Sequence, residues 1–157
     1  MKKVKIYRWC EQHTLEWTLP GTAPMRVTEE TWTRTPDKCG RLHREDGPAE
    51  IITRSWNAGF EETWYRDGVI HRGDDKPART SKQCIPGGSR ITMEWYSAGQ
   101  RHREPSWGEV GAVLVIELPR DGSAKVLRQE WWTRNQRQSV IFPVKLKELN
   151  KTNNNNN

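Results

Sequence analysis

One five-residue pattern occurs three times in the middle of this 157-residue chain. Residues 40–44, 68–72 and 99–103 each read Gly-x-x-His-Arg. Three of the four histidines thus share one slot, 28 and 31 residues apart: His43, His71 and His102. Self-similarity at a period of roughly 20–50 residues is typical of repeat architectures, in which each unit contacts mainly its neighbours. The pattern therefore predicts a repeat fold.

Tryptophan recurs at the same period, at Trp32, Trp64, Trp95 and Trp131. In the second and third units a Trp-Tyr pair precedes the glycine, whereas the first unit carries four extra residues at 35–38. The last unit, residues 131–137, has lost both the glycine and the histidine of the pattern. We therefore assign structural roles to the repeated positions, which are Trp32, Gly40, His43, Arg44, Gly68, His71, Gly99 and His102.

Turn signals divide the repeat region into short extended pieces. Asp67-Gly68 is flanked by β-branched and aromatic residues, which is a strong hairpin signal because glycine tolerates the positive φ of the turn. Pro77-Ala78 marks a second turn, since proline fixes φ where the chain becomes extended again. Such turns about every ten residues leave no room for ordinary helices. We expect antiparallel β structure over residues 25–142, with helix only in short pieces near the C-terminus.

The strands do not separate cleanly into apolar and polar faces. In residues 62–66, alternation places Trp64 on one face with Glu62 and Arg66, and Tyr65 on the other. The hydrophobic content is only 33%, yet nine tryptophans are present. A parallel α/β core is excluded, because buried parallel strands read as near-continuous Val/Ile/Leu runs and only residues 113–116 do so. The prediction is an all-β fold of meandering hairpin repeats in an elongated, thinly covered sheet.

Three regions are expected along the chain. Residues 1–30 form an N-terminal strand segment or a degenerate repeat, and residues 31–142 form the hairpin-repeat region. Residues 143–157 form a C-terminal tail that ends in an Asn-rich tract, which has little means of burying itself.

The composition also bears on localisation. The N-terminus lacks the apolar stretch of a signal peptide, and no run approaches the roughly 20 apolar residues of a membrane helix. The chain has an odd number of cysteines and no Cys-x-x-Cys pair; the three are Cys10, Cys39 and Cys84. They fit a reducing compartment and support neither a disulfide framework nor a cysteine zinc site. We expect a protein of the cytoplasm that has no membrane partner.

The unit Trp-Tyr-x-x-Gly-x-x-His-Arg, followed by Asp-Gly-Pro-Ala, resembles the MORN-like repeats of many bacteriophage and giant-virus proteins. Those repeats are distantly similar to the Tyr/Gly hairpin repeats of MORN proteins and of a bacterial antitoxin-like family. The resemblance covers residues 31–104 well. Over residues 105–142 it consists only of the spacing of the tryptophans and of the expected hairpins. It implies an elongated antiparallel sheet and a viral origin, with the host cytoplasm as the compartment, and it transfers no catalytic residue.

The repeated His-Arg could in principle carry chemistry. A ladder of stacked imidazoles is one metal-binding alternative, but a metal site is expected to bring carboxylates or thiolates together as well. We expect instead that each imidazole bonds the turn backbone of its own unit, and that the following arginine reaches nearby acids at 45–46 or 74–75. No nucleophile elbow or phosphate loop is present. We therefore expect no enzyme activity, metal or cofactor.

Two functions remain open. The favoured one is a non-enzymatic viral interaction protein, since Trp, Tyr and Arg dominate interface hot spots. Its partner would be a virion component or a host defence factor. The alternative is a single-stranded nucleic-acid binder in which tryptophans stack bases and arginines follow phosphates. The net charge of +6 is scattered along the chain rather than clustered, which disfavours that alternative. The candidate binding residues are Trp64, Trp95, Trp131, Arg66, Arg72 and Arg103. Among these we expect Arg66 and Arg103 to lie exposed at hairpin edges, and Trp64 to support the fold.

Overall fold

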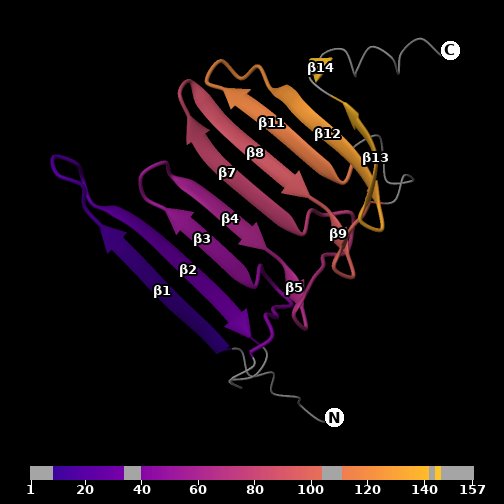
Figure 1. Cartoon of the computed structure of the whole chain (residues 1–157), viewed down its shortest axis with the longest axis horizontal. Coiled ribbons are helices and arrows are strands. Elements are labelled where there is room, and N and C mark those ends of the chain that lie inside the picture. The colour runs from indigo at the N-terminus through magenta and orange to yellow at the C-terminus, as the bar shows by residue number, and fades with distance from the viewer. Residues whose placement is uncertain (1–8, 34–39, 104–110, 142–143, 146–157) are drawn as a thin grey trace.

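The computed structural model describes residues 9–33, 40–103, 111–141 and 144–145 (Figure 1). Most of them form one ten-stranded antiparallel sheet in which neighbouring strands follow chain order. The strands across it are β1 (Trp9–Trp17), β2 (Met25–Thr33), β3 (Glu50–Arg54), β4 (Gly59–Thr63), β7 (Arg79–Ile85), β8 (Gly88–Glu94), β11 (Val113–Pro119), β12 (Lys125–Thr133) and β13 (Gln136–Ile141), with β14 (Val144–Lys145) paired to β12. The described ranges contain no helix, so the expected all-β meander is confirmed.

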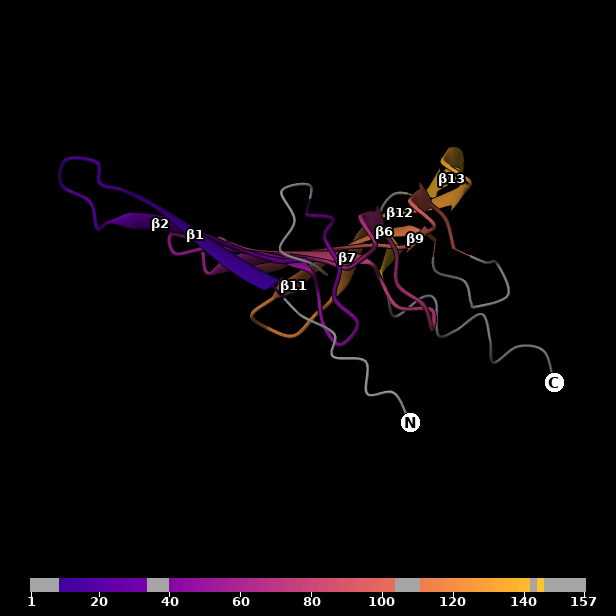
Figure 2. The same ribbon diagram turned by 90° about the horizontal axis from the view of Figure 1, so that it is seen from below.

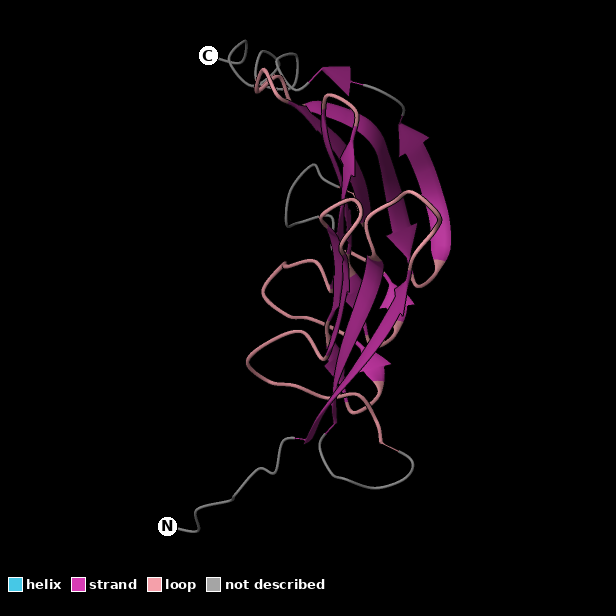
Figure 3. Ribbon diagram, turned by 90° about the vertical axis from the view of Figure 1, so that its left-hand side faces the viewer, coloured by secondary structure: helices cyan, strands magenta, loops and turns pink. Residues whose placement is uncertain are grey.

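The sheet is a single curved layer, seen edge on in Figure 2 and Figure 3. Its small core lies toward the C-terminal half, where Trp95, Ala112, Leu114 and Val126 are buried together. Met93, Ile116 and Trp132 pack against them. At the opposite edge, every described side chain of β1 is exposed. No helix in the described part is long and apolar enough to cross a membrane.

Two small hairpins extend the sheet at one end of its strands. The first pairs β5 (Tyr65–Arg66) with β6 (Val69–Ile70), and the second pairs β9 (Tyr96–Ser97) with β10 (Gln100–Arg101). One residue separates each small hairpin from the long strand before it. That residue is Trp64 between β4 and β5, and Trp95 between β8 and β9. The turn residues have positive φ, at Asp67 (50°), Gly68 (80°), Ala98 (48°) and Gly99 (78°). This is the turn geometry that the Asp-Gly signal predicts.

The last unit keeps this turn despite losing its glycine. Arg134 and Asn135 connect β12 to β13 with φ of 47° and 65°. Asparagine is one of the few residues that enter the left-handed region readily. Asn135 therefore takes the place that Gly68 and Gly99 occupy in the earlier hairpins, and the last hairpin is a divergent copy of the same unit.

Successive hairpins are stacked by equivalent backbone bonds. The amide of the second turn residue donates to the carbonyl just before the preceding unit's histidine position. These bonds run from Gly68 to Leu42 (2.8 Å), from Gly99 to Ile70 (3.0 Å) and from Asn135 to Arg101 (3.2 Å). Because these bonds are equivalent, each hairpin is positioned in the same way against the hairpin before it.

The tryptophans and histidines hold equivalent positions, as the alignment predicts. Each tryptophan carbonyl accepts the amide of its unit's histidine, His43 to Trp32 (2.8 Å), His71 to Trp64 (3.1 Å) and His102 to Trp95 (3.1 Å). Each tryptophan amide donates to an alanine carbonyl, to Ala49 (2.7 Å), Ala78 (2.7 Å) and Ala112 (2.9 Å). These alanines are fully buried, which explains the small residue at the end of each repeat motif.

The expected regional boundaries fall within the sheet. The boundary between residues 30 and 31 lies inside β2, which pairs with both β1 and β3. At the other end, Val144 and Lys145 pair with β12. Residues 146–157, which include the Asn-rich tract, lie outside the described residues.

Candidate functional site

The repeat histidines connect neighbouring units. His43 Nδ1 accepts the backbone N–H of Asp67 at 3.0 Å, and His71 Nδ1 accepts that of Ala98 at 3.3 Å. We expected each imidazole to bond the turn of its own unit, and that expectation is wrong. The next hairpin is stacked directly beside the histidine, so its turn amide is within reach. The histidines therefore fix the spacing between repeats.

The repeat arginines cover their own tryptophans. The guanidinium carbon lies 4.1 Å from the ring centroid for Arg44 on Trp32, 4.0 Å for Arg72 on Trp64 and 4.4 Å for Arg103 on Trp95. Such cation–π contacts contribute about 0.5–2 kcal/mol each. One face of each of these three indoles is consequently occupied within the protein.

The acidic partners expected for these arginines are present in two of three units. Arg44 Nε bonds Asp46 at 3.1 Å. Arg103 bonds both carboxylate oxygens of Asp75, at 2.6 and 2.5 Å, and so reaches back to the turn of the preceding unit. Arg72 differs, because its Nη1 donates to the carbonyl of Pro77 at 3.1 Å.

Two of the six candidate binding residues belong to the interior. Trp95 is only 7% exposed and its indole N–H donates to the Asp75 carbonyl, while the side chain of Arg103 is 9% exposed. The expectation that Arg103 lies free at a hairpin edge is wrong, because Asp75 and the Trp95 ring enclose it. Trp131 is half-buried on β12, where the strand register shifts before Trp132.

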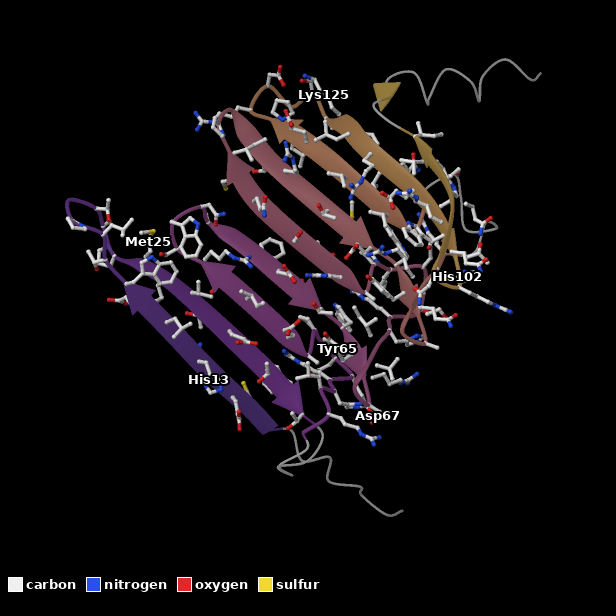
Figure 4. The ribbon with its side chains drawn as sticks, viewed as in Figure 1. His13, Met25, Tyr65, Asp67, His102 and Lys125 are labelled. Atoms are coloured by element: carbon white, nitrogen blue, oxygen red, sulfur yellow. The ribbon has the colours of Figure 1, made fainter. Side chains whose placement is uncertain are left out.

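The other three candidates, Trp64, Arg66 and Arg72, meet in an open pocket of about 700 Å³ between the first two repeats. Figure 4 shows Tyr65 and Asp67 of this region at the hairpin end of the strands, opposite Met25 and Lys125. The pocket is lined by His43, Arg44, Glu45, Asp46, Trp64, Tyr65, Arg66, His71, Arg72, Gly73, Asp74 and Lys76.

The cations of the pocket differ in how they are held. Arg44 is bonded to Asp46 and to the Pro48 carbonyl. Burial lowers the pKa of Arg72 from its ordinary value, and Glu62 partly opposes that shift. Arg66 and Lys76 are exposed, and no described residue forms an ion pair with either. The pocket therefore offers arginine and lysine donors that no acid among the described residues pairs with.

One polar atom of the pocket is both buried and without a bond. His43 is 6% exposed, and its Nε2 has no hydrogen-bond partner among the described residues. The nearby Glu45 Oε1 lies 3.8 Å away, beyond hydrogen-bonding distance.

Sequence reasoning missed several residues of this region. Glu45 and Asp74 were expected only as partners of the repeat arginines, and Lys76 was not considered, yet all three line the pocket. The signal that could have found them is their position one, two and four residues after a His-Arg pair. It also missed Arg101, which bonds Glu94 (2.7 Å) and Tyr96 Oη (3.0 Å) and lies 4.8 Å from the Trp132 ring. Arg101 thereby ties the third hairpin to the last.

Metal-binding and thiol chemistry find little support in the described residues. No group of three or more His, Cys, Asp or Glu residues there could hold a metal ion. Cys10 and Cys84 are free and exposed, and Cys39 lies outside the described part. Burial, reinforced by Glu30, raises the pKa of the Cys10 thiol, so its reactive thiolate is disfavoured.

The fold and the pocket together define an all-β repeat protein with a polar, cation-bearing pocket between its first two hairpin units. Comparison with known proteins adds nothing to this description: no family model matches the chain, and no curated protein or solved structure is similar to it.

Proposed function

We propose that this chain is a non-enzymatic interaction protein that binds a protein partner through its repeat sheet, with the pocket between the first two repeats as the contact site. The observation that carries this proposal is the meeting of Trp64, Arg66 and Arg72 around one pocket. Tryptophan and arginine are the residue types most enriched in interface hot spots, which cluster in well-packed pockets.

The pocket suits recognition of a polar segment. Trp64 and Tyr65 contribute ring surface, while Arg66 and Lys76, which pair with no acid among the described residues, contribute donors. The rigid backbone bonds between hairpins hold these groups in place before a partner arrives, which limits the entropy lost on binding.

The occupied indole faces favour a protein over single-stranded nucleic acid as the partner. Base stacking needs an open aromatic face. Trp95 is buried, and arginine already lies over Trp32 and Trp64. Trp32 and Trp95 therefore serve the fold, and recognition falls to the pocket that Trp64 helps to line.

The biological setting of this proposal rests on the resemblance of the repeat alone. On that basis we propose a viral or phage protein that acts in the host cytoplasm or in the virion. Its partner is then a virion component or a host defence factor.

Site-specific photo-crosslinking tests the proposal. A benzoylphenylalanine at position 45, on the exposed rim of the pocket, is compared with one at position 125, at the far end of the strands (Figure 4). In cells of the natural host we expect a nuclease-resistant protein adduct at position 45 only. We also expect it to disappear when Arg66→Ala and Lys76→Ala are added. A nuclease-sensitive adduct, or equal adducts at both positions, would overturn the proposal.

A further inference from the structure

We propose that the pocket between the first two repeats binds side-chain carboxylates, so that the partner presents an acidic peptide segment. This inference rests on the proposed protein-binding function and names the chemistry of the segment recognised. It follows from the protonation of two imidazoles, from one buried donor without a bond, and from the charges around the pocket.

The geometry at Nδ1 fixes the protonation of the imidazoles. A backbone N–H can only donate, so His43 Nδ1 must present a lone pair to the amide of Asp67. The Asp67 carboxylate also lies 3.1 Å from the same nitrogen, but the amide bond leaves no proton there. The neutral ring then carries its hydrogen on Nε2. The same reasoning applies to His71 and the amide of Ala98.

His43 lines the pocket, and its Nε2–H is a buried donor without an acceptor among the described residues. Leaving such a group unsatisfied is unfavourable, and natural proteins rarely do so without a functional reason. The oxygen of Glu45 is too distant to satisfy it. Both imidazoles belong to the pocket lining, so the unsatisfied donor of His43 lies in the wall of the space that a ligand would fill.

Three cationic side chains of the pocket favour a ligand with a charged acceptor over one with a neutral acceptor. Arg66 and Lys76 have no ion-pair partner among the described residues, and Arg72 is bonded only to a carbonyl and stacked on Trp64. Bonds between ionised donors and carboxylates are shorter and about twice as strong as neutral ones. A carboxylate thus uses the pocket better than a main-chain or amide carbonyl does.

The acids of the pocket limit how much negative charge a ligand can carry. Glu45, Asp46 and Asp74 line the pocket with Arg44, Arg66, Arg72 and Lys76, so the lining is only slightly positive. A nucleic-acid strand, with its closely spaced phosphates, would meet these three acids as well as the cations. A peptide with a few separated carboxylates can place them against the cations alone.

Fluorescence anisotropy with synthetic probes tests the inference. A labelled peptide of alternating serine and glutamate is titrated against the same peptide with glutamine in place of glutamate, and against a labelled oligothymidylate. We expect the glutamate peptide to bind at least about tenfold more tightly than either of the other probes, because each well-made charged contact accounts for about that factor.

Variants then assign the binding to the pocket. Arg66→Gln and Lys76→Gln should each weaken binding of the glutamate peptide about fivefold. Arg120→Gln, an exposed arginine at the far end of the strands, should leave it unchanged. Glu45→Gln should tighten binding, because it removes a negative charge from the pocket rim, and a gain of affinity cannot arise from misfolding.

Each other outcome overturns the inference. Equal binding of the glutamate and glutamine peptides would show a neutral acceptor, and tighter binding of the oligothymidylate would show a nucleic-acid ligand. Absence of binding by all three probes would also reject the carboxylate site. If photo-crosslinking still captures a protein at position 45, the proposed function stands while this inference fails.

Discussion

Arg66 and Arg103 lie in successive repeats yet have opposite surroundings. Arg66 is exposed on the first small hairpin, at the rim of the pocket. Arg103 is enclosed between the Trp95 ring and the Asp75 carboxylate, which it bonds through two nitrogens. The first side chain is available to a partner, whereas the second holds two repeats together.

These surroundings predict different costs of truncation. Arg103→Ala should lower the free energy of unfolding by about 2–4 kcal/mol, because it removes a cation–π contact and leaves the half-buried Asp75 without its partner. Arg66→Ala should change it by less than about 0.5 kcal/mol, as is usual for surface substitutions. Urea denaturation of both variants measures the difference, and equal stabilities would contradict the structural role of Arg103.

Tyr65 predicts a loss of stability at alkaline pH. Burial first, and then Glu50, raise the pKa of Tyr65 above its ordinary value near 10. Below about pH 10 the phenol is neutral in both folded and unfolded chains, and the shift has no effect. As the pH rises through that range, the unfolded chain loses its proton first and stability falls. The melting temperature of Tyr65→Phe should therefore fall less than that of the wild type between about pH 9 and pH 11. Parallel curves would contradict the burial of this ring.

At the scale of the element, the hairpin is the unit that repeats, and its turn is the most predictable part. Asp67-Gly68 announces the turn in the sequence, and Asn135 shows that the turn persists where the motif is lost. Ala98 has a φ of 48° at the turn position that Asp67 holds in the preceding hairpin, but it lacks the short polar side chain that lets Asp or Asn bond locally in the left-handed region. That conformation costs an alanine about 1–2 kcal/mol.

Asparagine at position 98 should therefore stabilise the protein. Ala98→Asn gives the Asn-Gly pair that this turn type favours, and should raise the free energy of unfolding by about 0.5–1 kcal/mol. The bond from the amide of residue 98 to His71 is unaffected by the change. Ser97→Asn, one residue earlier in strand β9, is the control and should give no gain. Equal effects at the two positions would contradict the turn assignment.

The edge strand β1 should be the least protected element of the main sheet. Its described side chains are all exposed, whereas Val113, Leu114 and Val115 of β11 are buried between β8 and β12. Local opening is easiest where few apolar contacts must break. In hydrogen exchange followed by mass spectrometry, peptides from 10–17 should exchange before those from 113–118. The reverse order would contradict the position of the core.

The repeat period made the fold predictable from the sequence. When Trp, Gly and His recur at a fixed spacing, each must occupy an equivalent position in successive units. The neighbour of each side chain was harder to predict. His43 bonds the turn of the next unit and Arg103 reaches back to the preceding one, and both contacts depend on how hairpins stack. Local sequence shows where a turn lies but not which turn lies beside it. For the same reason the sequence predicted Trp64, Arg66 and Arg72 as binding residues without showing that they line one pocket.

At the scale of the whole molecule, the protein is a single curved sheet whose hairpins stack along one end (Figure 1, Figure 3). A layer this thin buries few large apolar side chains, and equivalent contacts between successive units supply the order that a thick core would otherwise give. The histidines are central to those contacts. By accepting a bond from the next unit at Nδ1, His43 and His71 join repeats, and both residues line the pocket.

The bond from each histidine to the next hairpin can be measured directly by NMR. Scalar coupling across a hydrogen bond, detected between the amide nitrogen of one residue and the imidazole nitrogen of another, reports both the donor and the acceptor. We predict coupling from the Asp67 amide to His43 Nδ1 and from the Ala98 amide to His71 Nδ1, with the proton of each ring on Nε2. Absent couplings, or rings that carry their proton on Nδ1, would contradict the joining of the repeats by the histidines.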